Sequence, residues 1–260
     1  RVDQVLQGRT SGVTVSSSSG SPGAGTKIRI RGTGSSSNSD PLFIVDGMKV
    51  STIDNIAPSD IANIEVLKDA ASAAIYGTEG ANGVIIVTTK QGKEGGMKVS
   101  FSSQLGMQFV NTKMELMNAS QFVTYMNEAG QSSVVDNGVN TNWIDETFEN
   151  AFMQRYDFSL SGAYEKTSYY FSASNTDQKG IIGGDNSAFK RNSFRLNVKS
   201  EITDWLEIGI NSNTSFIKRT GIAENSDTRG VIQNMIIIDP LTPVTYTNGV
   251  PVDVFDRSAA

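Results

Sequence analysis

Polar and apolar residues alternate along much of the chain after residue 97. The first such run places five apolar residues on one face: Val99, Phe101, Leu105, Met107 and Phe109. Successive side chains of a β-strand point to opposite faces, so a period of two predicts a strand with one apolar and one polar face. Three further alternating runs, and one segment rich in Tyr, Phe and Ser, extend the prediction to five strands, the later four at 156–164, 168–176, 194–202 and 206–216.

The lengths of these runs and of their links narrow the possible folds. Each run has about ten residues, close to the ~9–11 that a tilted strand needs to cross a bilayer and more than the ~5–6 of a common soluble strand. The links at Glu165–Thr167 and Asp204 are short, whereas 111–154 is long and has a helical pattern at Ala119–Ala129. Alternating short and long links are typical of outer-membrane barrels. An antiparallel sandwich with one solvated face fits the alternation alone equally well.

The residues before a composition change at Gly92–Gly96 predict a different domain. They are rich in Gly and Ser, and short strands are predicted at Val13–Ser16, Lys27–Arg31, Leu42–Val45 and Gly83–Thr89. Ala70–Tyr76 is a strong helix former that ends at Gly77, and an amphipathic piece covers Val2–Leu6. Pro58-Ser59-Asp60 favours a helix start, yet Ile64–Leu67 also fits a buried strand. We predict a small α/β domain at 1–94 and a strand domain with loops at 95–260.

Composition removes several classes of function. The net charge of −5 and a pI near 4.9 lack the basic field that holds a nucleic-acid backbone, so we expect no nucleic-acid partner. The absence of His and Cys excludes His-based triads and thiolate metal sites. Because the chain starts at Arg1 without an apolar signal segment, we expect any export signal to lie upstream. Five strands cannot close a barrel, so we also expect further strands in the whole protein.

The first part of the chain carries a long series of ordered motifs. It closely resembles the plug domain of SusC/RagA-family TonB-dependent outer-membrane transporters in the runs LQGRTSGVTV, SGSPGAGTKIRIRGTGS, PLFIVDGM and DIANIEVLKDAASAAIYGTEGANGVIIVTTKQG. The later runs YDFSLSGAYEKTSYYFSASNTDQKGII and FKRNSFRLNVKSEITDWLEIGINSN are similar to early barrel hairpins of this family. The resemblance covers residues 5–92 most closely.

This resemblance implies a fold, a location and partners. It implies a transmembrane barrel of about 22 antiparallel strands around the plug, in the outer membrane of a Gram-negative bacterium and in contact with its lipid. It implies import of a glycan or peptide that a SusD-like surface lipoprotein captures, driven by TonB through a segment upstream of the plug. It implies no cofactor, no metal and no catalytic residue. Substrate-contacting residues are not predicted.

Charged residues of the first part are candidates for locking the plug to the barrel. Arg29, Arg31 and Gly32 belong to the IRIRG run that resembles the family motif, and alternation places both arginines on one strand face. Guanidinium groups pair well with carboxylates, so we predict that they lock the plug, with ligand contact as the alternative. Glu65, Lys68 and Asp69 could pair within the plug or with the barrel wall, and we include these three in the same role.

Glycines and one aspartate are candidates for tight turns. We predict a turn at Asp46-Gly47 and backbone conformations that disfavour a Cβ at Gly77, Gly80 and Gly83. Two other patterns suggest ligands but fit them poorly. The run at 20–27, GSPGAGTK, resembles a phosphate-binding loop but leads into a strand instead of a helix, and the spacing of Asp177 and Asp185 matches no calcium loop.

Three functions compete at this point. The first is active import of an oligomeric nutrient. The second is a soluble β-rich carbohydrate-binding module, suggested by the aromatic-rich strands. The third is an enzyme, which the absence of His and Cys disfavours. A glycosidase would need two carboxylates that flank a cleft, whereas the resemblance places Glu65 and Asp69 in a plug.

Overall fold

The computed structural model describes residues 12–17, 19–30, 32, 40–69, 74–93, 95–111, 114–223, 230–244, 246–247 and 250–251. The chain divides into two compact units. The first comprises Arg1–Leu105, Met153–Asp177 and Phe189–Lys218, and the second comprises Gly106–Phe152, Gln178–Ala188 and Arg219–Ala260. Each unit is described separately below. The predicted amphipathic piece at Val2–Leu6 lies outside the described residues.

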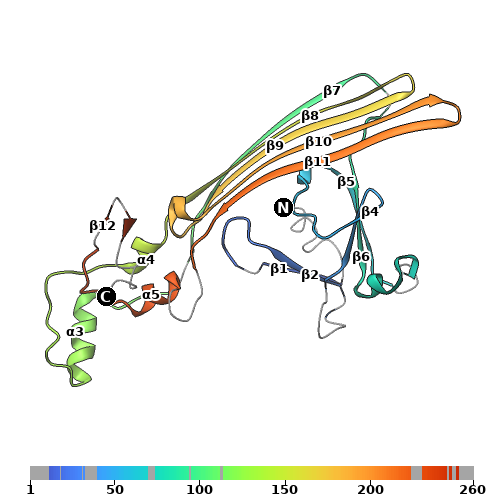
Figure 1. Cartoon of the computed structure of the whole chain (residues 1–260). Helices are drawn as coiled ribbons and strands as arrows, with labels where there is room; N and C mark the ends of the chain where they lie inside the picture. The colour runs from blue at the N-terminus through green and yellow to red at the C-terminus, as the bar shows by residue number, and fades with distance from the viewer. Residues whose placement is uncertain are drawn as a thin grey trace. The chain divides into compact units, whose positions relative to one another are not determined.

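Short strands form two small sheets in the N-terminal part of the first unit (Figure 1). A hairpin joins β1 (Val13–Ser17) to β2 (Thr26–Ile30). The second sheet has the order β4-β3-β6-β5, in which β3 and β6 are parallel and the outer pairs are antiparallel. Its strands are β3 (Leu42–Val45), β4 (Met48–Val50), β5 (Ile61–Leu67) and β6 (Val84–Thr89). We call residues 12–93 the N-terminal domain.

The strand β6 is buried because its sequence is a run of branched apolar residues. Val84, Ile85 and Val87 have no exposed surface, which suits a central strand covered on both faces. Burying each such side chain stabilises the fold by about 1.5–3 kcal/mol. The main core cluster consists of Ile28, Ile30, Val45, Ile53, Ile56, Ile85 and Val87. The predicted strand at Gly83–Thr89 is therefore confirmed, as is the one at Leu42–Val45.

The described residues of this domain include two 3-10 segments. Pro58–Asp60 is a 3-10 turn, η1, and the chain then enters β5 because Ile61–Leu67 can pair with β6. Of the two interpretations of this segment, the strand is correct. The described end of the predicted Ala70–Tyr76 helix, from Ala74, belongs to the 3-10 helix η2 (Ala74–Asn82), and residues 70–73 lie outside the described residues. Gly77 interrupts η2 with a φ of 65°.

Gly83 is the glycine whose replacement should disturb this domain most directly. Its φ is +90°, and a Cβ at this position would lie 2.7 Å from Cδ1 of the buried Ile30. We expect Gly83→Ala to lower the free energy of unfolding of the domain by about 1–3 kcal/mol, since strain and overpacking add. Urea denaturation of the full-length protein, followed by protease cleavage within the domain, measures this. Gly96→Ala is the control, because its Cβ would meet open space; equal effects would contradict the prediction.

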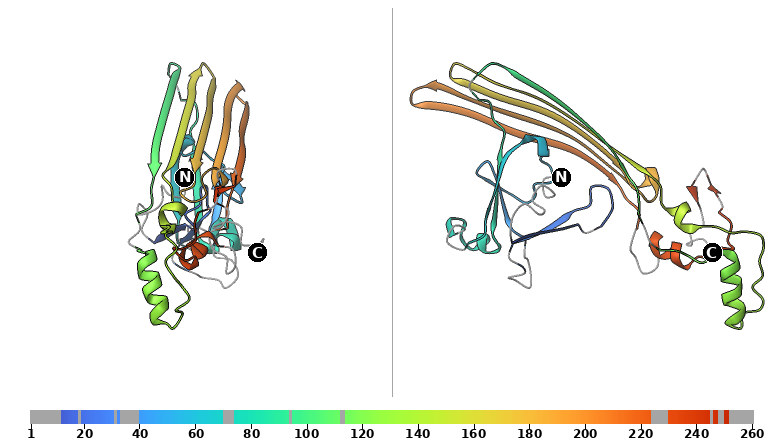
Figure 2. Two further views of the ribbon diagram at one scale, coloured as in Figure 1. Left: turned by 90° about the vertical axis from the view of Figure 1, so that its left-hand side faces the viewer. Right: turned by 180° about the vertical axis from the view of Figure 1, so that it is seen from behind.

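Five long strands form a sheet with the order β11-β10-β9-β8-β7, so each strand pairs with its neighbours in sequence (Figures 1 and 2). The strands have between 11 and 16 residues, longer than the alternation alone predicts. Two-residue turns at 165–166 and 204–205 join them in hairpins. Their bounds are β7 (Lys98–Gln108), β8 (Ala151–Tyr164), β9 (Thr167–Lys179), β10 (Ala188–Thr203) and β11 (Leu206–Thr220).

The second unit has its own small core. Trp143, Ile182, Val231, Met235 and Ile238 form this core, and the indole Nε1 of Trp143 donates to the carbonyl oxygen of Asp239 at 2.9 Å. The helix predicted at Ala119–Ala129 is confirmed as α3. The remaining elements are α3 (Ala119–Glu128), α4 (Trp143–Thr147), η3 (Gly184–Asn186), α5 (Val231–Ile237), β12 (Tyr246–Thr247) and β13 (Val250–Pro251).

The capping of α3 explains why it begins where it does. Asn118 accepts from the backbone N–H of Gln121, and the Gln121 side chain accepts in return from the Asn118 N–H, so a capping box closes the first turn. None of the helices in the described residues is both long and apolar enough to cross a membrane.

Candidate functional site

The long sheet has an inverted distribution of polarity within the first unit. We call the parts of β7–β11 in this unit the wall. Its outward side chains are apolar and exposed, as at Phe101, Phe158, Phe194, Leu196, Ile208, Ile210 and Phe216. Most of its buried side chains are polar, as at Asp157, Ser172, Ser174, Arg191, Ser193, Arg195 and Asn197. A sheet in a soluble protein places its apolar face inward, so an extended exposed apolar face indicates contact with lipid or a partner.

The buried polar face of the wall meets the N-terminal domain, and we call this contact the seam. Its centre is a cluster of Asp46, Thr89, Arg195 and Asn211. Nη2 of Arg195 donates to Oδ2 of Asp46 at 2.7 Å, and Nδ2 of Asn211 donates to the same oxygen at 2.9 Å. The Arg195 and Asp46 side chains are only 2% and 8% exposed. This ion pair is therefore largely shielded from water. Removal of either partner would leave the other as an uncompensated buried charge.

Local backbone geometry places Asp46 in this cluster. Asp46 and Gly47 link β3 to β4 and have φ values of 47° and 84°, as a two-residue hairpin turn of type I′ requires. The turn brings the carboxylate to the end of β6, where the Thr89 backbone N–H donates to Oδ1 at 2.8 Å and the Thr89 hydroxyl donates to Oδ2 at 2.6 Å. The Asp46 carboxylate thus links the end of β3 to the end of β6 within the N-terminal domain, in addition to its contacts with the wall.

The surroundings of Asp46 lower its pKa. Burial raises the pKa, because it disfavours the charged form, but hydrogen bonds from Thr89 and Asn211 and the charge of Arg195 outweigh that effect. The pKa of the carboxyl consequently lies below its ordinary value of 3.8. Asp46 is therefore ionised at neutral pH, and the seam contains a negatively charged carboxylate.

A second part of the seam surrounds the 3-10 turn η1. The Tyr170 hydroxyl on β9 donates to Oδ1 of Asp60 at 2.9 Å, and Asp60 is only 1% exposed. The Ser59 hydroxyl donates to Oδ1 of Asp157 at 2.8 Å, and Arg155 forms an ion pair with Asp157 at 2.9 Å. One turn of the N-terminal domain is therefore held by side chains from two adjacent strands.

A third part of the seam uses backbone carbonyl groups of the loop between β4 and η1. Nη1 of Arg191 donates to the carbonyl oxygen of Asp54 at 2.5 Å, and the Ser215 hydroxyl donates to that of Asn55 at 2.8 Å. Gly23 lies so close to the ring of Phe189 that a Cβ would overlap it. The contacts of the seam described here are mainly polar, and Gly23 and Phe189 add a close apolar contact.

The five predicted locking residues that the structure describes are not among the seam contacts given above. Arg29 is exposed on β2, opposite Thr14, and Gly32 is exposed with a φ of 90°, whereas Arg31 lies outside the described residues. Glu65 is exposed on β5 and accepts from Asn63 at 2.8 Å. Lys68 and Asp69 follow the end of β5. The seam contacts above come from other residues, and a locking role for these six stays a prediction.

Sequence reasoning missed most of the seam for an identifiable reason. Arg195 and Asp157 occupy polar positions of alternating strands, and alternation alone does not show whether such a polar face becomes covered. Ser59 and Asp60 were interpreted only as a helix start. The available signal was the charge itself, because an arginine on a strand face that is otherwise Ser and Asn needs a partner if that face becomes covered.

The remaining candidates are placed without forming a ligand site. Gly80 is buried in η2, and its carbonyl oxygen accepts from the N–H of Gly83 at 2.9 Å. Asp177 pairs with Lys190 at 2.9 Å, and in the second unit Asp185 pairs with Lys179 at 2.6 Å. The Gly-rich run that ends at Lys27 leads into β2. Over the part of the chain that the structure describes, no group of three or more metal-ligating side chains is present.

Comparison with known protein families and sequences finds consistent relatives. Residues 1–84 match the model of the TonB-dependent receptor plug domain. TonB-dependent receptor P3 of Formosa agariphila is 37% identical over 230 residues, which is 88% of this chain and 22% of that protein. TonB-dependent receptor SusC of Bacteroides thetaiotaomicron is 34% identical over 261 residues, 95% of this chain and 25% of SusC. The chain thus spans about a quarter of the length of these relatives.

Comparison with solved structures is consistent with the sequence matches. The RagAB peptide importer in its open-open state superposes with a TM-score of 0.84 and 28% identity, covering 99% of this chain and 33% of that one. The closed-closed state of the same importer gives a TM-score of 0.76 and 30% identity, covering 95% of this chain and 30% of that one. These matches extend over both the N-terminal domain and the long strands.

Proposed function

The chain belongs to the SusC/RagA family of TonB-dependent transporters, of which it forms the plug and the first barrel strands, and from this we propose that the whole protein imports an oligomeric nutrient across the outer membrane of a Gram-negative bacterium. Within it, residues 1–94 serve as the plug and 95–260 as the beginning of the barrel with its loops. The outward apolar face of the wall contacts outer-membrane lipid, and the polar face holds the plug.

The observation that carries this proposal is the polar seam. A plug that must be displaced in every transport cycle benefits from an interface that water can replace. Each hydrogen bond that breaks in the seam is exchanged for bonds to water, so its net cost is about 0.5–1.5 kcal/mol between neutral groups and about 1.5–3 kcal/mol where one group is charged. An apolar interface would lose about 25 cal/mol for each Å² that it exposes. Polar side chains on both surfaces therefore support a plug that is firmly placed but releasable.

The partners proposed for the whole protein come from its family. TonB would pull on a segment upstream of the plug and so open the seam, and a SusD-like lipoprotein would deliver the substrate from outside the cell. The substrate is a glycan or a peptide. No covalent step on the substrate is required of this chain, because import needs only binding, plug movement and release.

Transport assays test the proposal directly. A strain that lacks the gene should fail to accumulate labelled oligosaccharide or oligopeptide, and a plasmid copy should restore uptake. A protonophore should stop uptake in the restored strain, since the energy comes from the inner membrane. Recovery of the full-length protein from the aqueous fraction without detergent would refute the proposal.

A reversible cross-link across the seam should stop transport. The native chain has no cysteine, and the Ser59 hydroxyl lies 2.8 Å from the Asp157 carboxylate, so Ser59→Cys with Asp157→Cys places two thiols across the seam. We expect uptake to fall to background once gel mobility shows that the disulfide has formed, and to recover when a reductant opens it. Uptake is measured with labelled substrate in whole cells.

The matched control places the disulfide within the wall. Asn175 on β9 and Asn192 on β10 are not among the seam contacts, and Nδ2 of Asn175 donates to Oδ1 of Asn192 at 2.7 Å, so Asn175→Cys with Asn192→Cys joins β9 to β10 and leaves the plug free. Oxidised cells with this pair should transport normally. Normal uptake by cells whose plug is cross-linked to the wall would show that the seam does not open during transport.

A further inference from the structure

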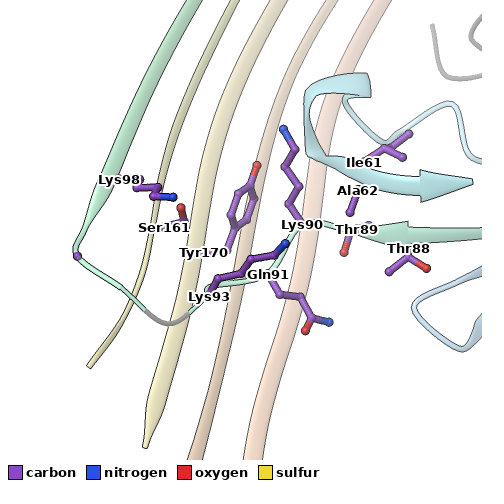
Figure 3. Close-up of a pocket in the computed structure, with 11 residues that line it drawn as sticks. Ile61, Ala62, Thr88, Thr89, Lys90, Gln91, Lys93, Lys98, Ser161 and Tyr170 are labelled. Atoms are coloured by element: carbon purple, nitrogen blue, oxygen red, sulfur yellow. The ribbon is translucent and has the colours of Figure 1, made fainter. Parts of the chain in front are cut away.

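A basic cavity lies where the plug continues into the barrel. It has a volume of about 560 Å³, within the range of small-molecule sites, and it lies within the first unit. Figure 3 shows Lys90 and Gln91 beyond the end of β6, Lys93 on the linker to β7, and Lys98 on β7 itself. The lining residues are Ile61, Ala62, Thr88, Thr89, Lys90, Gln91, Lys93, Gly96, Lys98, Ser161 and Tyr170.

The charges around this cavity are unbalanced. Three lysines line it, and no Asp or Glu is among the lining residues that the structure describes. Within the described ranges, neither Lys90, Lys93 nor Lys98 has a carboxylate within ion-pair distance. Lysines elsewhere do have one: Lys49, Lys166, Lys179, Lys190 and Lys199. In a chain whose net charge is −5, three ammonium groups that have no carboxylate partner among the described residues form a local positive site around one cavity.

The cavity has walls of fixed geometry on two sides. Gly92 packs so tightly against the backbone of Gly162 and Tyr169 that a Cβ would overlap them, so the linker is held against β8 and β9. Tyr170 and Thr89 line the cavity and also belong to the seam, where their hydroxyl groups are already bonded. The hydrogen bonds of Tyr170 and Thr89 hold the side of the cavity that faces the seam.

We propose that this cavity binds a molecule that carries at least two oxyanion groups. Ammonium groups form charge-assisted hydrogen bonds with carboxylate and phosphate oxygens. The three lysines come from the plug end, the linker and the wall, so a single small anion neutralises only part of the site, whereas an extended polyanion reaches all of it. Ser161, Gln91 and Thr88 supply neutral polar groups for the rest of the ligand. The proposal concerns binding alone and does not depend on import.

Titration calorimetry on the full-length transporter in detergent tests the site. Pyrophosphate and citrate are the probes, because they separate phosphate from carboxylate chemistry, and acetate is the single-charge comparison. We expect at least one polyanion to bind more tightly than acetate, with an affinity that falls as salt rises. The triple variant Lys90→Gln, Lys93→Gln and Lys98→Gln should bind that polyanion at least about tenfold more weakly.

A second triple variant serves as the matched control. Lys27→Gln, Lys49→Gln and Lys218→Gln remove the same amount of charge from exposed positions that do not line the cavity. This variant should keep the affinity of the native protein. Equal weakening in both triple variants would show a general charge effect, and absence of heat with both polyanions would show that the cavity is not an anion site. Either result overturns the proposal.

Discussion

Replacing Arg195 with methionine is expected to weaken the docking of the plug by about 3–5 kcal/mol. Methionine keeps most of the length of the side chain but leaves the buried Asp46 carboxylate without its cation, and removal of one partner of a buried ion pair costs about this much. The Thr89 backbone N–H, which donates to Asp46, reports the change, because its hydrogen exchange requires the cluster to open. We expect its exchange to accelerate by on the order of 100-fold or more.

An exposed ion pair provides the control for Arg195→Met. Lys166 and Asp204 pair at 2.9 Å, but their side chains are 55% and 96% exposed. Lys166→Gln should therefore change stability by less than about 1 kcal/mol and leave the exchange of Thr89 unaltered. If both variants accelerate exchange at Thr89 equally, the seam is not held by the Asp46–Arg195 cluster.

Acidic pH should weaken the cluster around Asp46 and Arg195. The pKa of Asp46 is lower in the folded protein than in the unfolded chain, so its contribution to stability is complete above the ordinary pKa. That contribution is lost as the pH falls through the lowered pKa of the folded state. Exchange at Thr89, corrected for its intrinsic pH dependence, should be steady from neutral pH to about pH 4 and then increase. In Asp46→Asn this acid-dependent part should disappear.

Replacing Leu196 with arginine is expected to destabilise the barrel by about 2–4 kcal/mol. Leu196 is 41% exposed on the outward face of β10 and lies about seven residues from the turn after Thr203. In the proposed membrane barrel, with ~3.3 Å per residue and a strand tilt of about 40°, this position would lie near the middle of the lipid layer, where an arginine is most costly. The fraction of full-length protein that assembles in the outer membrane, measured by heat-modified gel mobility, should fall.

A variant at Ile202 tests whether the loss of stability in Leu196→Arg is caused by the depth of the arginine in a bilayer. Ile202 lies on the same face of the same strand and is 55% exposed, but it is next to the last residue of β10. Ile202→Arg should cost only about 0–1 kcal/mol, because the charge reaches the membrane interface. A soluble carbohydrate-binding sheet would treat the two arginines alike. Equal assembly of both variants would therefore favour that alternative over a membrane barrel.

The strands were predictable from the sequence because the alternation of strand faces depends only on residues that are neighbours in the chain. Alternation places Phe194 and Leu196 on one face and Arg195 on the other whatever the rest of the protein does, and the structure confirms that separation. Strand lengths were underestimated, since pairing between neighbours extends β10 to 16 residues beyond its clearly alternating part.

The seam was not predictable from the sequence, because it depends on residues far apart in the chain. Asp46 and Asn211 are separated by 165 positions, and no local pattern links them. The segment Ile61–Leu67 shows the same limit on a smaller scale. Its spacing fits a helix as well as a strand, and the choice is made by pairing with β6, a partner that local periodicity does not reveal.

The position of the seam residues along the chain also has a consequence for biogenesis. The wall side chains that bond to the plug in the described residues lie between Arg155 and Ser215, on strands that follow the plug directly. The contacts between the plug and these wall side chains therefore need only the first 215 positions of the chain. Docking once these positions are present would cover the polar face of an open sheet, so the plug can act as the template on which the barrel begins to curve.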